Sequence, residues 1–208
     1  MIMVKFTEEK RLWNKGFKRI VGIDEAGRGP LAGPVAAAAV LFNKSIDLKP
    51  FEKLRDSKKL SKKQRIHFYS LIIKNPKIEW GFARVSEKVI DKINILEATK
   101  LAMEKAVRNL ETKKEKADFL ILDGNININS KTRQKAIVKA DEKVLSCMAA
   151  SIIAKVKRDG IMESLDEKYP QYGFKKHKGY PTYHHVKMLK KHGPCKIHRR
   201  SFYPVKES

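Results

Sequence analysis

The sequence predicts an α/β protein with one main domain followed by a small basic extension. Short apolar runs and longer helical patterns occur in the order strands, helices, strand, helix along the 208 residues. The 42% content of hydrophobic residues is enough to build a core and argues against a disordered chain. A shift in composition after Pro170 sets the last part of the chain apart.

Four short apolar runs predict the strands. Residues 20–23 and 34–42 predict two strands joined by a glycine-rich turn, and residues 78–85 predict a third. The fourth run, residues 119–122, is continuous and ends at Asp123 and a glycine. That pattern is typical of a buried strand that leads into a loop.

Helical periodicity fills the segments between and after these strands. Ser61 is predicted to cap a helix that continues to Ile73, and Ser86 to cap a longer helical region that reaches Val107. From Lys143 to about Tyr169 the apolar positions keep to one side, which predicts a long helix.

The chain carries 46 Lys and Arg against 23 Asp and Glu, a net charge of +23. Such an excess favours polyanionic partners, because phosphates neutralised by Lys and Arg release counterions. Solubility or a lysine-rich codon bias is the alternative. Residues 175–208 hold ten of the basic residues, one acid and five of the six histidines, and Thr182 is predicted to cap a short helix there.

The chain has the features of a cytoplasmic protein. Charged residues begin at Glu8, so the start lacks the apolar segment of a signal peptide. The longest uncharged apolar stretch, residues 31–42, is shorter than the roughly 20 residues of a membrane helix. Cys147 and Cys195 have no CxxC spacing and are expected to be unpaired.

Acidic residues at the ends of apolar strands are the informative positions in so basic a chain. Asp24 and Glu25 follow the first strand, and Asp123 follows the fourth. A charge beside a strand core is costly unless it is paired or binds a metal, and ligands collect at the carboxyl ends of strands. On position alone, a salt bridge to one of the lysines explains each acid equally well.

Asp141 precedes the long helix, where capping of the first turn is the simpler interpretation. A cluster of carboxylates suits Mg²⁺ or Mn²⁺, and a pair of such ions supports phosphodiester cleavage. Neighbouring side chains on a strand face opposite ways, so we hypothesise that Asp24 is the principal bridging ligand. Glu25 would help through its main-chain carbonyl or after a bend in the strand. Asp159 lies about 27 Å from Asp141 along a straight helix and is expected to form a structural ion pair.

Six motifs, in the expected order, resemble the bacterial ribonuclease HII family, the type 2 ribonucleases H. The motifs are Gly22-Ile23-Asp24-Glu25-Ala26-Gly27-Arg28-Gly29-Pro30-Leu31-Ala32-Gly33-Pro34-Val35, Asp56-Ser57-Lys58-Lys59-Leu60-Ser61, Leu122-Asp123-Gly124, Lys139-Ala140-Asp141, Ala149 to Arg158-Asp159, and His177-Lys178-Gly179-Tyr180-Pro181-Thr182. Six ordered motifs are far more specific than one glycine-rich segment.

The resemblance implies a ribonuclease H-like fold, with a central mixed β-sheet flanked by helices and a small C-terminal helical extension. We expect a catalytic domain over residues 1–168 and a basic extension over residues 169–208 that contributes to substrate binding. The implied activity is endonucleolytic hydrolysis of RNA in RNA–DNA hybrids, and cutting 5′ of single ribonucleotides embedded in duplex DNA. A two-ion site with Mg²⁺ or Mn²⁺ would leave 3′-hydroxyl and 5′-phosphate ends.

The resemblance also assigns residues. The catalytic and metal-binding acids would be Asp24, Glu25, Asp123 and Asp141, which replaces capping as the interpretation of the last.

The remaining assignments concern substrate binding. The loop Gly27-Arg28-Gly29 resembles the family element that senses the 2′-hydroxyl at an RNA–DNA junction, and glycines permit such close approach. Tyr180 matches the tyrosine that packs on the sugar beside the junction. Lys58 and Lys59 are candidate phosphate contacts, with a solvated basic patch as the alternative.

We expect a monomer that does not dock on a sliding clamp, because no glutamine-anchored aromatic motif is seen and the ending at residues 199–204 resembles the bacterial form. Two other functions stay open on the residues. One is a less selective Mg²⁺ nuclease of the same fold, and the other is a basic nucleic-acid-binding protein without catalysis.

Overall fold

The computed structural model describes residues 6–112 and 115–208, so the first five residues of the expected catalytic domain lie outside the described part. The strands are β1 (Ile20–Ala26), β2 (Val35–Phe42), β3 (Ile78–Val85), β4 (Phe119–Asp123) and β5 (Arg133–Ile137). The helices are α1 (Thr7–Trp13), α2 (Lys62–Lys74), α3 (Glu87–Glu111), α4 (Ala140–Lys143), α5 (Leu145–Lys168), α6 (Phe174–His177) and α7 (Tyr183–His192). Short 3-10 turns lie at Lys49–Phe51, Ser57–Lys59, Pro170–Tyr172 and Val205–Glu207.

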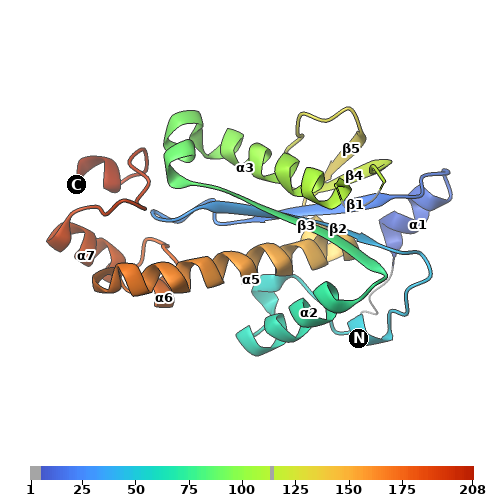
Figure 1. Ribbon diagram of the computed structural model, residues 1–208, viewed down its shortest axis with the longest axis horizontal. Helices are drawn as coiled ribbons and strands as arrows, with labels where there is room; N and C mark the ends of the chain where they lie inside the picture. The colour runs from blue at the N-terminus through green and yellow to red at the C-terminus, as the bar shows by residue number, and fades with distance from the viewer. Residues whose placement is uncertain (1–5, 113–114) are drawn as a thin grey trace.

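The strands form one mixed sheet in the order β3-β2-β1-β4-β5. The pairs β3–β2 and β2–β1 are antiparallel, whereas β1–β4 and β4–β5 are parallel. Figure 1 shows α3 along one face of the sheet and α5 with α2 along the other. The α7 region lies at the end of the molecule toward which the β1–β2 connection projects (Figure 1). The expected α/β architecture is therefore confirmed.

The predicted strands are present, and the first is longer than expected. β1 continues through Asp24 and Glu25 to Ala26, because the antiparallel pairing with β2 extends over these residues. The strand β5 and the helices α1, α4 and α6 were not predicted. Residues 133–137 are only partly buried at the sheet edge and carry little apolar alternation, and α4 is a single turn.

Two of the three predicted helix caps form hydrogen bonds. Ser61 makes a capping box with Gln64, and the Thr182 hydroxyl accepts from the His185 amide at 3.3 Å. Ser86 makes no side-chain cap contact among the described residues. Helix α3 is interrupted at Asn94, where φ is 67°. The side-chain oxygen of Asn94 accepts hydrogen bonds from the amides of residues 96 and 97.

Close packing of α5 on β1 positions the carboxyl end of β1. A Cβ at Gly22 would lie 2.4 Å from Ser146 Oγ and 2.5 Å from the Cys147 amide nitrogen. The Glu9 carboxylate from α1 accepts from Ser146 N at 2.9 Å and from its hydroxyl at 2.8 Å. Only glycine at position 22 therefore lets the start of α5 lie this close to the sheet.

The last part of the chain is joined to the β1–β2 loop by backbone hydrogen bonds. The amides of Leu31 and Gly33 donate to the carbonyls of Gly179 and Ile197, each at 2.8 Å, and the Arg199 amide donates to Leu31 at 2.8 Å. The expected extension 169–208 therefore packs directly on residues 27–34. Cys147 and Cys195 are both unpaired, and none of the described helices is long and apolar enough to cross a membrane.

Gly22→Ala is expected to lower the free energy of unfolding by about 1–3 kcal/mol, because the new methyl group overlaps the backbone of α5. Urea unfolding measures the change. Gly160→Ala is the matched control. Gly160 lies on α5, the helix that packs on Gly22, and a Cβ built at Gly160 has no atom within 4 Å. There alanine is expected to stabilise by about 0.4–1 kcal/mol. Equal losses at both positions would contradict the close approach.

Candidate functional site

Two carboxylates lie side by side at the carboxyl ends of neighbouring strands. Ile23 of β1 pairs with Leu122 of β4, so the next residues, Asp24 and Asp123, are adjacent. Side chains alternate along a strand, and Gly22 on the same face as Asp24 contacts α5. Both aspartates therefore project toward the α5 side of the sheet.

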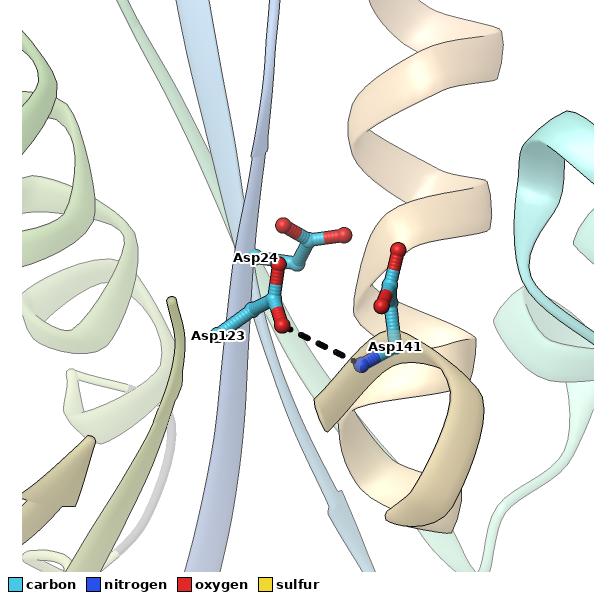
Figure 2. A group of neighbouring side chains, drawn as sticks. All are labelled: Asp24, Asp123 and Asp141. Carbon is cyan, nitrogen blue, oxygen red and sulfur yellow. Dashed lines mark hydrogen bonds between the residues drawn. The ribbon is translucent and has the colours of Figure 1, made fainter. Parts of the chain in front are cut away.

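Asp141 completes the group from α4. Asp24, Asp123 and Asp141 each offer an oxygen within 4.8 Å of the others, and they are the group among the described residues that could hold a metal ion. Asp24 and Asp141 are each 5% exposed. Figure 2 shows the three carboxyl groups turned toward one another, with Asp141 on the turn that leads into α5. Three oxygen donors without His or Cys suit a hard divalent cation.

The Asp123 carboxylate holds the first turn of α4 in place. Its Oδ1 accepts from the Ala140 amide at 2.6 Å and from the Asp141 amide at 3.4 Å. Helix α5 begins after Val144, which makes no side-chain cap contact. Asp141 therefore does not cap the long helix as the sequence suggested. Asp123 caps the turn α4 that precedes it, and the Asp141 carboxylate is left to face the cluster.

Burial and mutual repulsion make the charged form of these acids costly. Burial, with the charges of Glu25 and Asp123, raises the pKa of Asp24 well above its ordinary value. Burial, with the charges of Asp123 and Asp56, raises the pKa of Asp141. A bound cation would remove this cost, because an opposite charge nearby favours the ionised form.

Glu25 lies beside the three aspartates but outside the group that could share an ion. Its Oε1 is 3.5 Å from Arg28 Nη1, and its amide donates to Asp24 Oδ1 at 2.7 Å. Burial raises its pKa, partly offset by the charge of Arg28. Asp24 is thus the member of the pair that belongs to the three-aspartate group, and its role as principal ligand stays a prediction.

The Lys58-Lys59 turn lies against α4. Lys58 Nζ is 3.6 Å from Asp141 Oδ2, and Lys59 Nζ is 2.9 Å from Glu142 Oε2. Burial lowers the pKa of Lys58, but the negative charges of Asp56, Asp141 and Asp24 outweigh this effect. The pKa of Lys58 is therefore raised. The Lys58 side chain is 80% exposed, so its ammonium group is available to a ligand at the acidic cluster.

The Gly27-Arg28-Gly29 loop packs against a buried arginine that sequence reasoning did not assign to it. Arg158 from α5 is fully buried and donates to the carbonyls of Pro34 at 3.0 Å and Lys178 at 3.1 Å. Gly27 has φ of +95°, and a Cβ there would lie 1.9 Å from Arg158 Nε. Glycine is required at position 27 for both reasons.

A second buried arginine reaches the same loop from the end of the chain. Arg199 donates to the carbonyls of Gly27 at 2.6 Å, Arg28 at 2.8 Å and Gly33 at 3.0 Å. Burial, with the nearby charge of Arg158, lowers its pKa to about 9. The basic composition of the tail concealed this role, because nothing in the pattern separates one buried arginine from its exposed neighbours.

Tyr180 lies beside this loop. Its Cε1 is 3.6 Å from the Cβ position of Gly29, and its side chain is partly exposed. The other aromatics of the segment divide in two groups. Tyr172 and Phe174 are buried in the core, whereas Tyr183 is 84% exposed. Tyr180 is thus near the loop and accessible to a ligand.

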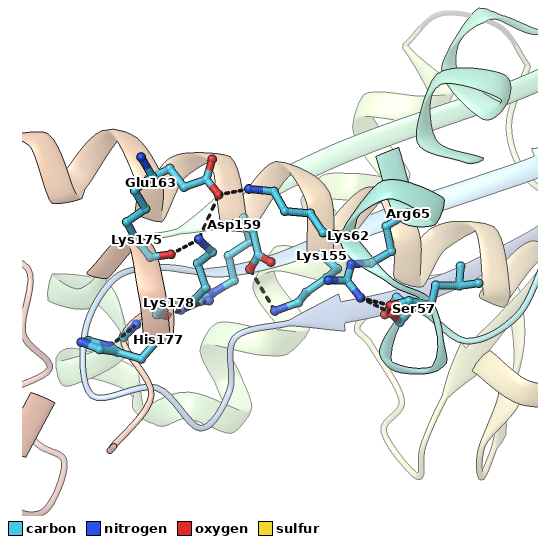
Figure 3. A network of polar contacts seen from close by, with 12 residues as sticks. Ser57, Lys62, Arg65, Lys155, Asp159, Glu163, Lys175, His177 and Lys178 are labelled. Atoms are coloured by element: carbon cyan, nitrogen blue, oxygen red, sulfur yellow. Dashed lines mark hydrogen bonds and ion pairs between the residues drawn. The ribbon is translucent and has the colours of Figure 1, made fainter. Parts of the chain in front are cut away.

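Acids farther along α5 form structural ion pairs (Figure 3). Asp159 Oδ1 is 2.9 Å from Lys155 Nζ, which is the kind of pair expected for it. Glu163 contacts Lys62 at 2.7 Å and Lys178 at 2.9 Å, and these two lysines lower its pKa to about 2. Glu163 thereby joins α2 to the segment that carries Tyr180.

Comparison with known proteins identifies relatives over nearly the whole chain. Residues 21–205 match the family model described as Ribonuclease HII. A ribonuclease HII of Chlamydia trachomatis serovar A is 48% identical over 200 residues, covering 96% of this chain and 89% of that protein.

Two solved structures share the fold. The ribonuclease H2 from Pyrococcus horikoshii OT3 has a TM-score of 0.75 at 26% identity, covering 91% of this chain and 96% of that one. The structure of the PCNA:RNase HII complex from Archaeoglobus fulgidus gives 0.72 at 28% identity, covering 88% and 95%. These similarities confirm the expected ribonuclease H-like fold.

Metal-free Asp24→Asn is expected to be more stable than the wild type near neutral pH. The raised pKa means that the folded chain binds the Asp24 proton more tightly than the unfolded chain does. Ionisation therefore removes stability as pH rises from about 4 through the folded-state pKa.

Thermal unfolding in a chelator, at about pH 7.5 and about pH 4.5, measures the effect. We expect a gain of at least about 2–4 °C at the higher pH, the shift for one kcal/mol in a chain of this size. The gain should shrink at the lower pH. Asp159→Asn, which removes an ion-paired acid, serves as the control. A gain of the same size at both pH values would contradict an origin in ionisation.

Proposed function

The chain belongs to the ribonuclease HII family, the type 2 ribonucleases H, and on this premise we propose that it cuts duplex DNA on the 5′ side of single embedded ribonucleotides. The family's endonucleolytic hydrolysis of RNA in RNA–DNA hybrids is the broader activity. The observation that carries the proposal is the convergence of Asp24, Asp123 and Asp141, next to which Arg28 of the loop lies 3.5 Å from Glu25.

The acids are proposed to bind two Mg²⁺ or Mn²⁺ ions. Asp24 would be the principal ligand, Asp123 and Asp141 would complete the group, and Glu25 would assist from beside it. When bound, two such ions would activate the attacking water and stabilise the leaving oxygen. Asp123 would also keep Asp141 in place through its hydrogen bond to the Ala140 amide at 2.6 Å.

Selection of the ribonucleotide is assigned to the loop and to Tyr180. The carbonyls of Gly27 and Arg28 accept from Arg199, which fixes the shape of the loop. Glycine at position 29 allows a sugar to approach the backbone, and the 2′-hydroxyl is the group that distinguishes RNA from DNA. Tyr180 would pack on the sugar next to it.

The basic residues are proposed to bind the duplex through its phosphates. Lys58 and Lys59 lie next to the acidic cluster, and the extension 169–208 lies next to the loop. Phosphate contacts of this kind carry no sequence information and make binding salt-dependent. We further propose that the protein acts as a monomer and without a sliding clamp, because residues 199–204 resemble the bacterial form of the family.

Asp123→Asn is expected to abolish cleavage while the protein still binds the duplex. The loss of activity should exceed the roughly 10- to 100-fold that removal of an outer-shell partner costs. Asparagine keeps an oxygen for the Ala140 amide, so the change removes a ligand charge with little disturbance of α4. Cleavage rates at saturating Mn²⁺ and a binding titration measure both effects. Asp159→Asn is the control, and retained turnover in Asp123→Asn would rule out the assignment.

Tyr180→Ala is expected to weaken cleavage at an embedded ribonucleotide by about 1–3 kcal/mol in kcat/KM, the value of a base–aromatic contact. Three duplexes test the change: all-DNA, one ribonucleotide in DNA, and a continuous RNA–DNA hybrid. Tyr203→Ala, at a tyrosine that is 75% exposed, is the matched control.

Wild-type cleavage of the single-ribonucleotide duplex but not of all-DNA is the expected result. Cleavage of all three duplexes would favour a less selective nuclease, and binding without cleavage in either metal would favour a non-catalytic protein. An unchanged preference in Tyr180→Ala would exclude its proposed role.

A further inference from the structure

Two fully buried histidines form a row of hydrogen bonds that ends at Tyr180. His185 is 0% and His198 is 1% exposed. The Cys195 amide is 3.0 Å from His198 Nδ1, His198 Nε2 is 3.1 Å from His185 Nε2, and His185 Nδ1 is 2.9 Å from the Tyr180 carbonyl oxygen. The row therefore runs from a backbone amide to a backbone carbonyl through two imidazole rings.

The two backbone groups fix the protonation of both rings. An amide N–H can only donate, so His198 Nδ1 accepts and the proton of a neutral His198 is on Nε2. That proton is donated to His185 Nε2, which places the His185 proton on Nδ1, where it is donated to the Tyr180 carbonyl. One arrangement of two neutral rings satisfies all three contacts. Burial favours neutral rings and lowers the pKa of each to about 4.

The row connects the two elements that select the ribonucleotide. At one end it holds the Tyr180 carbonyl, which also accepts from the Thr182 amide at 2.8 Å across Pro181. At the other end His198 is followed by Arg199, whose guanidinium donates to Gly27 and Arg28. The Tyr180 ring and the loop are in contact near Gly29.

We propose that His185 and His198 are positioning residues that fix Tyr180 relative to the Gly27–Gly29 loop through this directed row. The inference rests on the proposed function, in which Tyr180 packs on the sugar beside the junction. Neither ring touches the substrate in this proposal. The histidines act through the carbonyl of Tyr180, and the direction of the row, from Cys195 to Tyr180, is what makes them specific.

Amide side chains test the direction, because asparagine places a donor near the Nδ1 position of histidine and glutamine places one near Nε2. His185→Asn keeps a donor for the Tyr180 carbonyl, whereas His185→Gln loses it. At position 198 the order reverses. His198→Gln keeps a donor toward His185 Nε2, whereas His198→Asn keeps only the contacts with the amide and thiol of Cys195.

We expect a crossed pattern in kcat/KM on the duplex with one ribonucleotide, in which asparagine is the tolerated amide at position 185 and glutamine at position 198. His185→Gln and His198→Asn should lose about 10- to 100-fold, as a misplacement near 1 Å can cause. His185→Asn and His198→Gln should retain most of the activity. A purely structural role would follow size and would favour the same amide at both positions. His67→Asn, at an exposed histidine on α2, is the matched control.

Two outcomes overturn the proposal. One is an equal loss for Asn and Gln at each position among variants with matching thermal unfolding. The other is the wrong tautomer in the wild type, which long-range ¹H–¹⁵N NMR of labelled histidine reports without any variant. The expected spectrum has His185 protonated at Nδ1 and His198 at Nε2.

The control Tyr180→Ala separates this inference from the proposed function. If Tyr180→Ala cuts the single-ribonucleotide duplex as well as the wild type does, the role of Tyr180 fails, whatever the tautomers are. If Tyr180→Ala is impaired and the crossed pattern is absent, the tyrosine has its role and the histidine row does not.

Discussion

Two buried guanidinium groups, those of Arg158 and Arg199, are the constraint on which the arrangement of the site depends. Each donates to backbone carbonyls, and among the described residues no carboxylate lies within salt-bridge distance of either. A buried cation is costly unless its donors are satisfied. The carbonyls belong largely to residues 27–34, so any other shape of this loop would leave two buried charges without acceptors. The loop is held rigid by the chemistry of its anchors, although it contains three glycines.

Backbone groups also contact the negative charges of the acidic cluster, just as they contact the two buried guanidinium groups. The Asp123 carboxylate accepts a hydrogen bond from the Ala140 amide, and the Asp24 carboxylate accepts one from the Glu25 amide. The ion pairs at the cluster are long, 3.5 Å at Glu25 and 3.6 Å at Asp141. Side-chain counterions therefore neutralise the acids weakly. A protein with a net charge of +23 keeps a concentrated negative site next to its positive surface, because backbone groups hold each set in place while leaving its charge for a ligand.

The strands other than β5, the long helices and the acids could be predicted from the sequence, because they depend on local periodicity and on charges beside apolar runs. The strand β5 could not be predicted, because its partly exposed residues show little alternation of apolar and polar side chains. The buried roles of Arg158 and Arg199 could not be predicted either. Those roles depend on contacts across more than 120 positions, which no local pattern encodes. Position in the chain suggests that Asp141 caps the long helix. The capping contact in this region is instead made by Asp123, which accepts from the Ala140 amide of α4, 17 positions later in the chain but adjacent in space.

The guanidinium of Arg199 binds carbonyls that were synthesised more than 160 residues before it. During translation, the first hairpin and its acids therefore emerge long before the group that shapes their loop. Contacts between such distant positions form late, because the loop-closure entropy must be overcome first. A nascent or prematurely terminated chain would hold the acids without the guanidinium that shapes residues 27–29. The loop therefore takes its final shape only once the end of the chain has been made.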